Sequence, residues 1–159
     1  MGPRSPSRVR ARAWCRVDLA GGTLDLWPLG LLHPGSRTVN LAIDLPVVVE
    51  LILAQKGYRI RQGSSEVAAE SARQLADTEE GALLGLIALD AGLPPSTIHI
   101  ESASPQGGGL GASSALAVAT MAAAEALTGQ QASSALQLAT RARDIEAQLM
   151  SLPTGVQDH

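Results

Sequence analysis

The segment that decides the fold of this 159-residue chain is SPQGGGLGASSA, residues 104–115. It follows the short run TIHIES (97–102), which predicts a strand, and it precedes an alanine-rich run that predicts a helix ending near Gly129. Glycines let the backbone approach a ligand closely, and a helix N-terminus presents N–H groups with about half a positive charge. The segment therefore predicts an anion cradle; a flexible turn capped by ordinary serines is the alternative.

Other loop chemistries fit this segment less well. A Walker A loop needs a lysine followed by Ser or Thr, but the single lysine, Lys56, lies elsewhere and is followed by glycine. Gly107, Gly109 and Ala112 do match the dinucleotide pattern G-x-G-x-x-A, yet the predicted helix leads to another helix instead of a second parallel strand. A nucleophile elbow would require G-x-S-x-G around Ser113, which is absent.

The residues before the glycine segment predict a sheet. Alternating apolar residues predict a strand over 13–19 that runs into a glycine pair. Residues 38–53 form an apolar run interrupted by Pro46, which predicts one bent strand or two, and residues 58–62 are expected to be its antiparallel hairpin partner.

Two further helices are predicted from capping signals. Asp77 with Glu80 resembles a capping box for a helix that stops at Gly92. Ser134 with Gln137 predicts the start of the last helix, whose apolar stripe contains Leu138, Ala142, Ile145 and Leu149. Strands followed by a helical pair indicate the α+β class.

Composition excludes several classes of function. The net charge of −3, from 12 Lys+Arg against 15 Asp+Glu, provides no basic stripe for nucleic acid. A single cysteine, Cys15, excludes an internal disulfide and favours a cytoplasmic location, and three scattered histidines make a zinc site improbable. No apolar run is long enough for a membrane span. Residues 1–10 predict a disordered basic tail ahead of a domain at 11–159.

The order of Pro105, Gly109-Leu110-Gly111 and Ser113-Ser114-Ala115 resembles the central signature of the GHMP kinases, the superfamily of galactokinase, homoserine kinase, mevalonate kinase and phosphomevalonate kinase. The resemblance implies an N-terminal GHMP-kinase domain with the ribosomal protein S5 domain 2-like α+β fold. It also implies a lysine-free loop for the phosphates of ATP, formed by Gly107, Gly108, Gly109, Leu110, Gly111, Ala112, Ser113 and Ser114.

An earlier segment, RVDLAGGTLDL (16–26), resembles the first signature of the family as the sugar kinases have it. The resemblance implies that Asp25, with Gly22 and Thr23 beside it, binds substrate hydroxyls, for which a charged acceptor is well suited. It also implies that Arg16 offsets negative charge near the transferred phosphate. The simpler alternatives are a turn cap for Asp25 and a strand-edge ion pair for Arg16.

The C-terminal segment resembles the heptose 7-phosphate kinase and fucokinase-like branch, in which Gly-x-Gln-Asp follows a helix. By this resemblance Glu146 ligates Mg²⁺ together with Ser113, although Ser114 remains an alternative, and Asp158 is the catalytic base. Phosphoryl transfer requires such hard oxygen ligands and a carboxylate that orients the nucleophile. The alternatives are a solvated helix face for Glu146 and an ordinary terminal residue for Asp158.

Taken together, the three segments imply ATP-dependent, Mg²⁺-requiring phosphorylation of a hydroxyl on a sugar or sugar phosphate. The alternative is a nucleotide-binding or regulatory module of the same fold without catalysis. Because members of the family continue into a second α+β domain, we expect this truncated portion, with the C-terminal domain absent, to be inactive alone and to expose apolar surface. The resemblance is compatible with a homodimer.

Overall fold

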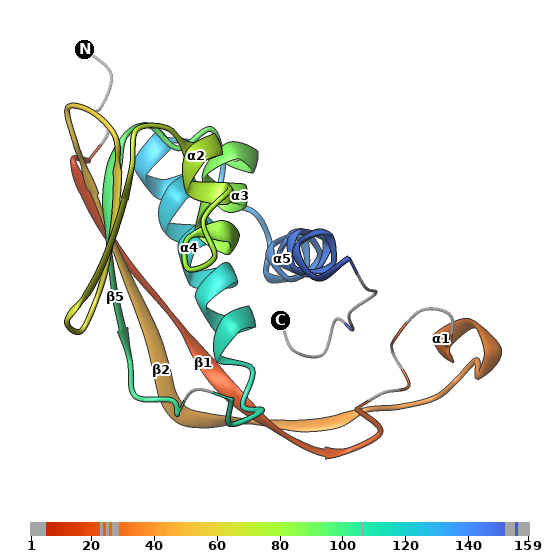
Figure 1. Cartoon of the computed structure of the whole chain (residues 1–159). Helices are drawn as coiled ribbons and strands as arrows, with labels where there is room; N and C mark the ends of the chain where they lie inside the picture. The colour runs from red at the N-terminus through yellow and green to blue at the C-terminus, as the bar shows by residue number, and fades with distance from the viewer. Residues whose placement is uncertain are drawn as a thin grey trace.

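The computed structural model describes residues 6–22, 24, 26, 29–105, 107–151 and 155. Its elements are β1 (Arg8–Ala20), α1 (Leu29–Leu32), β2 (Val39–Leu53), β3 (Tyr58–Gln62), β4 (Ser65–Ala69), α2 (Ala72–Ala76), α3 (Ala82–Asp90), β5 (Ser96–Ser102), α4 (Ala112–Thr128) and α5 (Ala135–Met150). One sheet packs against α2, α3 and α4, with α5 beyond them, so the predicted α+β class is confirmed (Figure 1). Each helix in the described part is too short to cross a bilayer.

The sheet has the strand order β1-β2-β5-β3-β4, and every pairing is antiparallel except that of β3 with β5. The expected hairpin between residues 58–62 and 38–53 is wrong. The edge of β2 that it would use is occupied by β5, and β3 instead turns directly into β4. β4 has the sequence SEVAA, in which only Val67 is a strongly apolar strand former, so no strand was predicted there.

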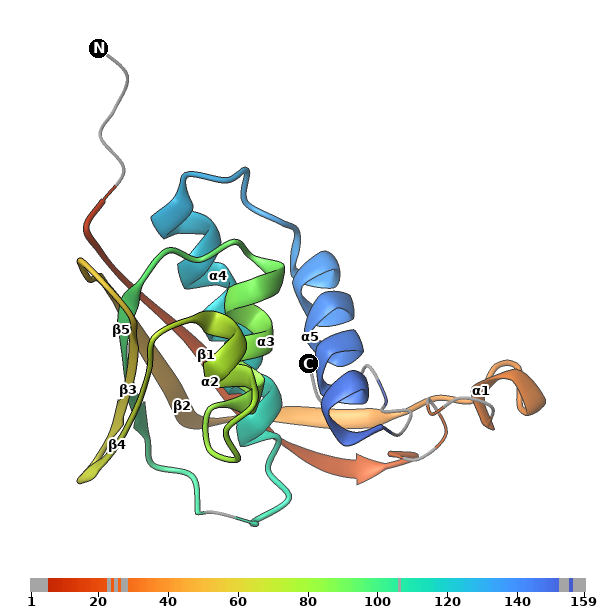
Figure 2. The ribbon, with the colours of Figure 1, turned by 45° about the horizontal axis from the view of Figure 1, so that its top comes forward.

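β2 is one bent strand that contains Pro46. Of the two alternatives for residues 38–53, one bent strand or two strands, the first is therefore confirmed. Pro46 lies opposite Trp14, and the register between β1 and β2 shifts immediately afterwards, at the fully buried Cys15. Beyond the shift Ile43 and Leu45 still pack against the core, and the far ends of the two strands form an arm that leads to α1 (Figure 2). Leu19 is 61% exposed there, so the expected inward-facing alternation through Leu19 is wrong beyond the shift.

The N-terminal boundary also needs correction, because β1 begins at Arg8, within the region predicted as a disordered tail. Val9 packs against the core, whereas the arginines on either side of it face solvent. Arg8 and Arg10 pair with Glu50 of β2 and Glu101 of β5. Val9 and Ala11 alternate with Arg8, Arg10 and Arg12, so the strand period of two extends into the region predicted as a tail.

The helical region after β4 differs from the prediction. α2 is capped by Ser71, whose hydroxyl accepts a hydrogen bond from the backbone N–H of Gln74 at 3.2 Å. Asp77 follows the last residue of α2, and α3 starts only after Gly81, so the expected capping box of Asp77 and Glu80 is wrong. The sequence spacing was correct for a box, but two short helices occupy the region instead of one.

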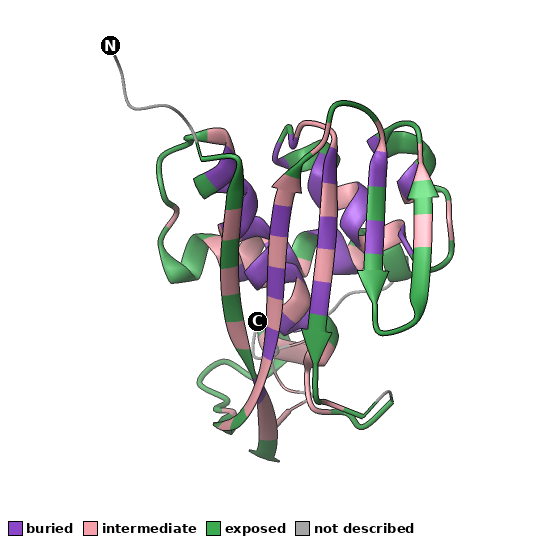
Figure 3. Ribbon diagram, turned by 90° about the vertical axis from the view of Figure 1, so that its left-hand side faces the viewer, coloured by how far each residue is buried: buried purple, intermediate pink, exposed green. Residues whose placement is uncertain are grey.

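The last two helices were predicted correctly, except that Leu149, expected in the apolar stripe of the last helix, is 42% exposed. α4 ends at Gly129, which has a left-handed φ of 71°, and α5 begins with the complete capping box of Ser134 and Gln137. α4 packs across β1 and β2, and α5 packs on α4 and α3. Figure 3, which views the sheet from the side opposite the helices, shows buried positions alternating along the central strands.

Candidate functional site

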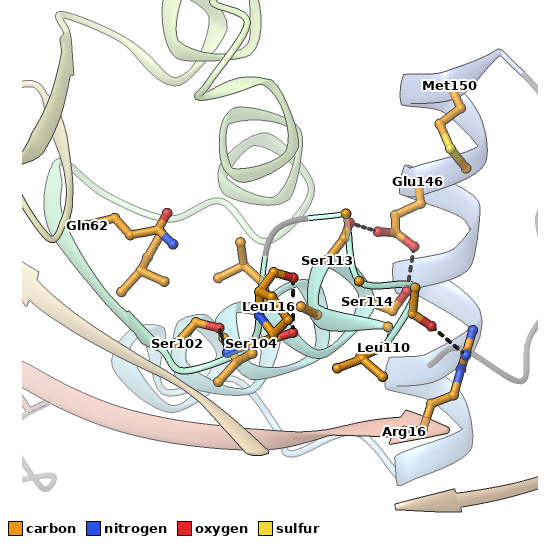
Figure 4. Close-up of a pocket in the computed structure, with 18 residues that line it drawn as sticks. Arg16, Gln62, Ser102, Ser104, Leu110, Ser113, Ser114, Leu116, Glu146 and Met150 are labelled. Atoms are coloured by element: carbon orange, nitrogen blue, oxygen red, sulfur yellow. Dashed lines mark hydrogen bonds between the residues drawn. The ribbon is translucent and has the colours of Figure 1, made fainter. Parts of the chain in front are cut away.

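The glycine segment lines a cavity of about 510 Å³ beside the start of α4 (Figure 4). All eight residues of the predicted loop, from Gly107 to Ser114, are among those that line it. The other lining residues come from six elements, β1, β2, β3, β5, α4 and α5, and from the start of the loop after β5: Arg16, Val47, Gln62, Ile100, Ser102, Ser104, Pro105, Leu116, Glu146 and Met150. The cavity therefore joins residues that are up to 134 positions apart, the separation of Arg16 and Met150.

The loop has a conformation that only glycine adopts easily. Gly107, Gly109 and Gly111 have φ values of 71°, 64° and 69°, in the left-handed region. Gly111 is also the N-cap residue of α4, and no side chain caps this helix end. The N–H groups of the first turn have no partner within the helix, and Ala112, Ser113 and Ser114 line the cavity, so the positive end of the helix dipole lies beside it. This arrangement suits a phosphate group.

A carboxylate from α5 reaches this helix end. The hydroxyl of Ser114 donates to Oε2 of Glu146 at 2.8 Å, and the hydroxyl of Ser113 donates to Oε1 of the same group. Glu146 is only 6% exposed, so the alternative of a solvated helix face is wrong. Ser114 is buried whereas Ser113 is exposed. Of the two hydroxyls, that of Ser113 is therefore the one accessible to a ligand.

Arg16 connects β1 to the glycine loop. Its backbone N–H donates to the carbonyl oxygen of Leu110 at 2.9 Å, and its guanidinium donates to the carbonyl oxygen of Gly109 at 3.1 Å. These two bonds place a permanent positive charge at the wall of the cavity, beside the loop that could hold a phosphate.

Some predicted site residues are not brought to this cavity. Gly22 lies in the turn after β1 and is not among the residues that line it. Thr23, Asp25 and Asp158 lie outside the described residues, so their roles stay predictions. Sequence reasoning also missed Gln62, which lines the cavity from the end of β3, because a single glutamine at a strand end carries no recognisable pattern.

The donor set fits a magnesium ion. Mg²⁺ prefers oxygen ligands, and proteins typically hold it with one or two carboxylates plus the phosphates of the substrate. Glu146 supplies a buried carboxylate and Ser113 an adjacent hydroxyl, and both line the cavity beside the loop. Ser113 and Glu146 are therefore the residues that could hold the ion.

Residues 66–159 match the sequence family described as GHMP kinases N terminal domain. The chain belongs to this family. The N-terminal GHMP-kinase fold expected from the sequence signatures is thereby confirmed. In the comparison with curated proteins, no sequence matches this one.

Solved structures of kinases share the fold. A putative sugar kinase from Campylobacter jejuni matches with a TM-score of 0.73 and 22% identity, over 98% of this chain and 50% of that one. A D-glycero-D-manno-heptose 1-phosphate kinase from Bacteriodes thetaiotaomicron matches with a TM-score of 0.72 and 22% identity, over 94% and 51% of the two chains. Phosphomevalonate kinase of Streptococcus pneumoniae, in complex with phosphomevalonate and AMPPNP, has a TM-score of 0.60 at 20% identity, over 86% and 42%. This chain thus spans about half the length of these structures.

Proposed function

We propose that the natural protein containing this chain transfers a phosphoryl group from ATP to a hydroxyl of a sugar or sugar phosphate. The observation that carries the proposal is the contact of Ser113 and Ser114 with the buried carboxylate of Glu146 at the end of a glycine loop. The family membership supports kinase chemistry, and two of the similar structures are described as sugar kinase and heptose 1-phosphate kinase. A similar structure that holds AMPPNP supports ATP as the donor.

In this proposal the residues of the cavity have three separate roles. The loop from Gly107 to Ser114 accommodates the phosphates through backbone N–H groups. Ser113 and Glu146 hold Mg²⁺, which neutralises charge on the phosphate oxygens. Arg16 offsets the negative charge that develops on the transferred group, because its guanidinium is already fixed against the loop.

The acceptor side of the proposal rests on residues predicted from the sequence. Asp25, with Gly22 and Thr23, binds the hydroxyls of the sugar. Asp158 accepts the proton of the attacking hydroxyl late in the transfer, when that hydroxyl becomes acidic as it bonds to phosphorus. Gly155, three residues before Asp158, is buried, and the helix that carries Glu146 ends only a few residues earlier.

The experiment is calorimetric titration with ATP, with and without Mg²⁺, followed by assay of ADP release with a panel of sugars and sugar phosphates. The protein used is the natural protein that contains this chain. We expect Mg²⁺ to strengthen ATP binding and at least one acceptor to release ADP. Asp158→Asn should keep ATP binding while turnover collapses. Nucleotide binding without ADP release from any acceptor would instead favour a regulatory module.

A further inference from the structure

Helix α5 carries Glu146, but the packing of its apolar side chains contributes little to fixing its position along α4. It lies on the far side of α4 and α3 from the sheet (Figures 1 and 2). The apolar side chains that it buries are small or few: Ala139, Ala142 and Ile145. Interlocking of side-chain ridges fixes how one helix sits along another, and alanine ridges are shallow. Polar contacts must therefore contribute to fixing α5 along α4.

One such contact is the pair of bonds from Ser113 and Ser114 to Glu146. If Glu146 binds a cation, Oε1 has to exchange its contact with Ser113 for the ion, which leaves the bond of Ser114 to Oε2. A second anchor, elsewhere on α5 and outside the cavity, would hold the helix in place while Oε1 changes partners.

Arg141 occupies such a place, five residues before Glu146 on α5. One guanidinium nitrogen lies 2.5 Å from Oε1 of Glu125 on α4, and the other lies 2.6 Å from Oδ2 of Asp90 at the end of α3. The carboxylate of Glu125 also accepts hydrogen bonds from the backbone N–H and the hydroxyl of Ser133, at 2.9 and 2.7 Å. These four residues, the Arg141 cluster, connect three helices with the segment that leads into α5.

The cluster is protected from solvent at its centre. The side chain of Glu125 is 5% exposed, and that of Arg141 is 32% exposed. Charge-assisted bonds between a guanidinium and carboxylates are directional and are strengthened where water is scarce. Glu125 lies eleven residues beyond Ser114 on α4, about 17 Å along the helix. The cluster thus holds the α4–α5 interface at a point well separated from the cavity.

We propose that Arg141 is a positioning residue, which fixes α5 along α4 through Glu125 and Asp90 and so keeps Glu146 beside Ser113 for magnesium binding. The inference rests on the proposed function, since it assigns Glu146 a metal-binding role. It adds a residue that no sequence signature of the site contains.

The test compares Arg141→Met with Arg143→Met. Arg143 is a matched control, because its side chain is 31% exposed on the same helix and pairs with its neighbour Asp144 within α5. ATP is titrated calorimetrically in MgCl₂ and in EDTA, well below the melting temperature of each variant. We expect Arg141→Met to reduce the Mg²⁺-dependent gain in ATP affinity about tenfold, the lower end for residues that support metal ligands. ATP affinity in EDTA should be unchanged, Arg143→Met should match the wild type, and Arg141→Lys should recover part of the gain.

Asp90→Ala covers the case in which Arg141→Met does not fold, because it removes one arm of the cluster and leaves the bond between Arg141 and Glu125. Asp90→Ala should reduce the Mg²⁺-dependent gain in ATP affinity by a smaller factor than Arg141→Met does. A full Mg²⁺-dependent gain in every folded variant of Arg141 and Asp90 would overturn the inference, even if melting temperatures fall. Absence of that gain in the wild type would instead contradict the proposed function.

Discussion

At the scale of single residues, the proposed binding of Mg²⁺ depends on the carboxylate of Glu146. Glu146→Gln keeps the shape of the side chain but removes its charge, so we expect ATP affinity in MgCl₂ to fall at least about tenfold, since loss of a group that only supports a metal ligand already costs about that much. ATP affinity in EDTA should change little. Calorimetric titration under both conditions measures the effect.

Asp144→Asn is the control for that substitution, since it removes a carboxylate from the same helix at a position whose side chain is 61% exposed. It should bind ATP as the wild type does with and without Mg²⁺. Equal loss of affinity in both variants would mean that the charge of α5 as a whole matters, and Glu146 would lose its assigned role.

The surroundings of Glu125 predict that the free energy of unfolding depends on pH. Burial raises the pKa of its carboxyl, but the hydrogen bonds from Ser133 and Arg141 outweigh burial, so the pKa in the folded protein lies below the ordinary value of 4.5. The stabilisation is therefore complete above pH 4.5 and is lost as the pH falls through the folded pKa. We expect Glu125→Gln to cost about 1 to 3 kcal/mol of unfolding free energy at neutral pH.

Thermal denaturation across a pH series checks this expectation. The difference in melting temperature between the wild type and Glu125→Gln should stay constant from neutral pH down to about pH 4.5 and shrink as the pH falls further. A difference that does not shrink below pH 4.5 would show that the ionised form of Glu125 is not what stabilises the fold.

The residues of the site were not equally predictable from the sequence. The glycine loop and Ser113 belong to one contiguous signature, and Glu146 was proposed from the resemblance of the C-terminal segment to the family. Arg141 and Gln62 lie outside any signature, and their positions depend on which helices and strands become neighbours in three dimensions. Neither composition nor spacing carries that information.

At the scale of elements, Gly85 determines how closely α3 approaches α2. A Cβ atom at this position would lie 2.5 Å from the Cα atom of Ala76, which is backbone and cannot move aside easily. Replacing a helical glycine by alanine normally stabilises a helix by about 0.5–1 kcal/mol. Here we expect Gly85→Ala to destabilise the protein by about 1–3 kcal/mol, the usual cost of overpacking.

Chemical denaturation of Gly85→Ala measures the sign of the change directly. Ala82→Gly serves as the comparison, because it alters helix propensity at the start of the same helix without adding an atom. If Gly85→Ala raises the unfolding free energy, the close approach of α3 to Ala76 is not required by the fold.

Elements with local signals were predicted well, and elements that depend on distant partners were not. The capping box of α5 and the glycine at the end of α4 are fixed within a few residues of sequence. The partners of β3 are not fixed by nearby sequence. Residues 58–62 could pair with the strand before or the strand after them, and their second partner, β5, begins only at residue 96. The short α2 was missed because its cap, Ser71, was not recognised.

At the scale of the whole molecule, the candidate site depends on three parts that meet at one end of α4. β1 supplies Arg16, the loop after β5 supplies the glycines, and α5 supplies Glu146. α4 packs on the sheet and α5 packs on α4, so the sheet positions α5 only through intervening helices. This layered dependence supports the proposal that a contact far from the cavity, at Arg141, positions the carboxylate within it.

The arm and α1, to which it leads, carry large apolar side chains that the rest of the described chain leaves exposed. The exposed fractions are 61% for Leu19, 73% for Leu31, 52% for Val39 and 59% for Leu41. Exposed apolar side chains gathered in one region promote association. We expect the 159-residue chain to associate reversibly as its concentration rises and the double variant Leu31→Glu with Leu41→Glu to remain monomeric. Sedimentation velocity over a concentration series measures this.

The matched control is Leu136→Glu, because Leu136 is 71% exposed but lies at the start of α5, away from the arm. If the arm is the associating surface, this variant should associate as the wild type does, since a single added charge elsewhere leaves the apolar patch intact. Suppression of association by Leu136→Glu to the same degree would show that net charge controls it. The absence of association in the wild type would contradict the prediction outright.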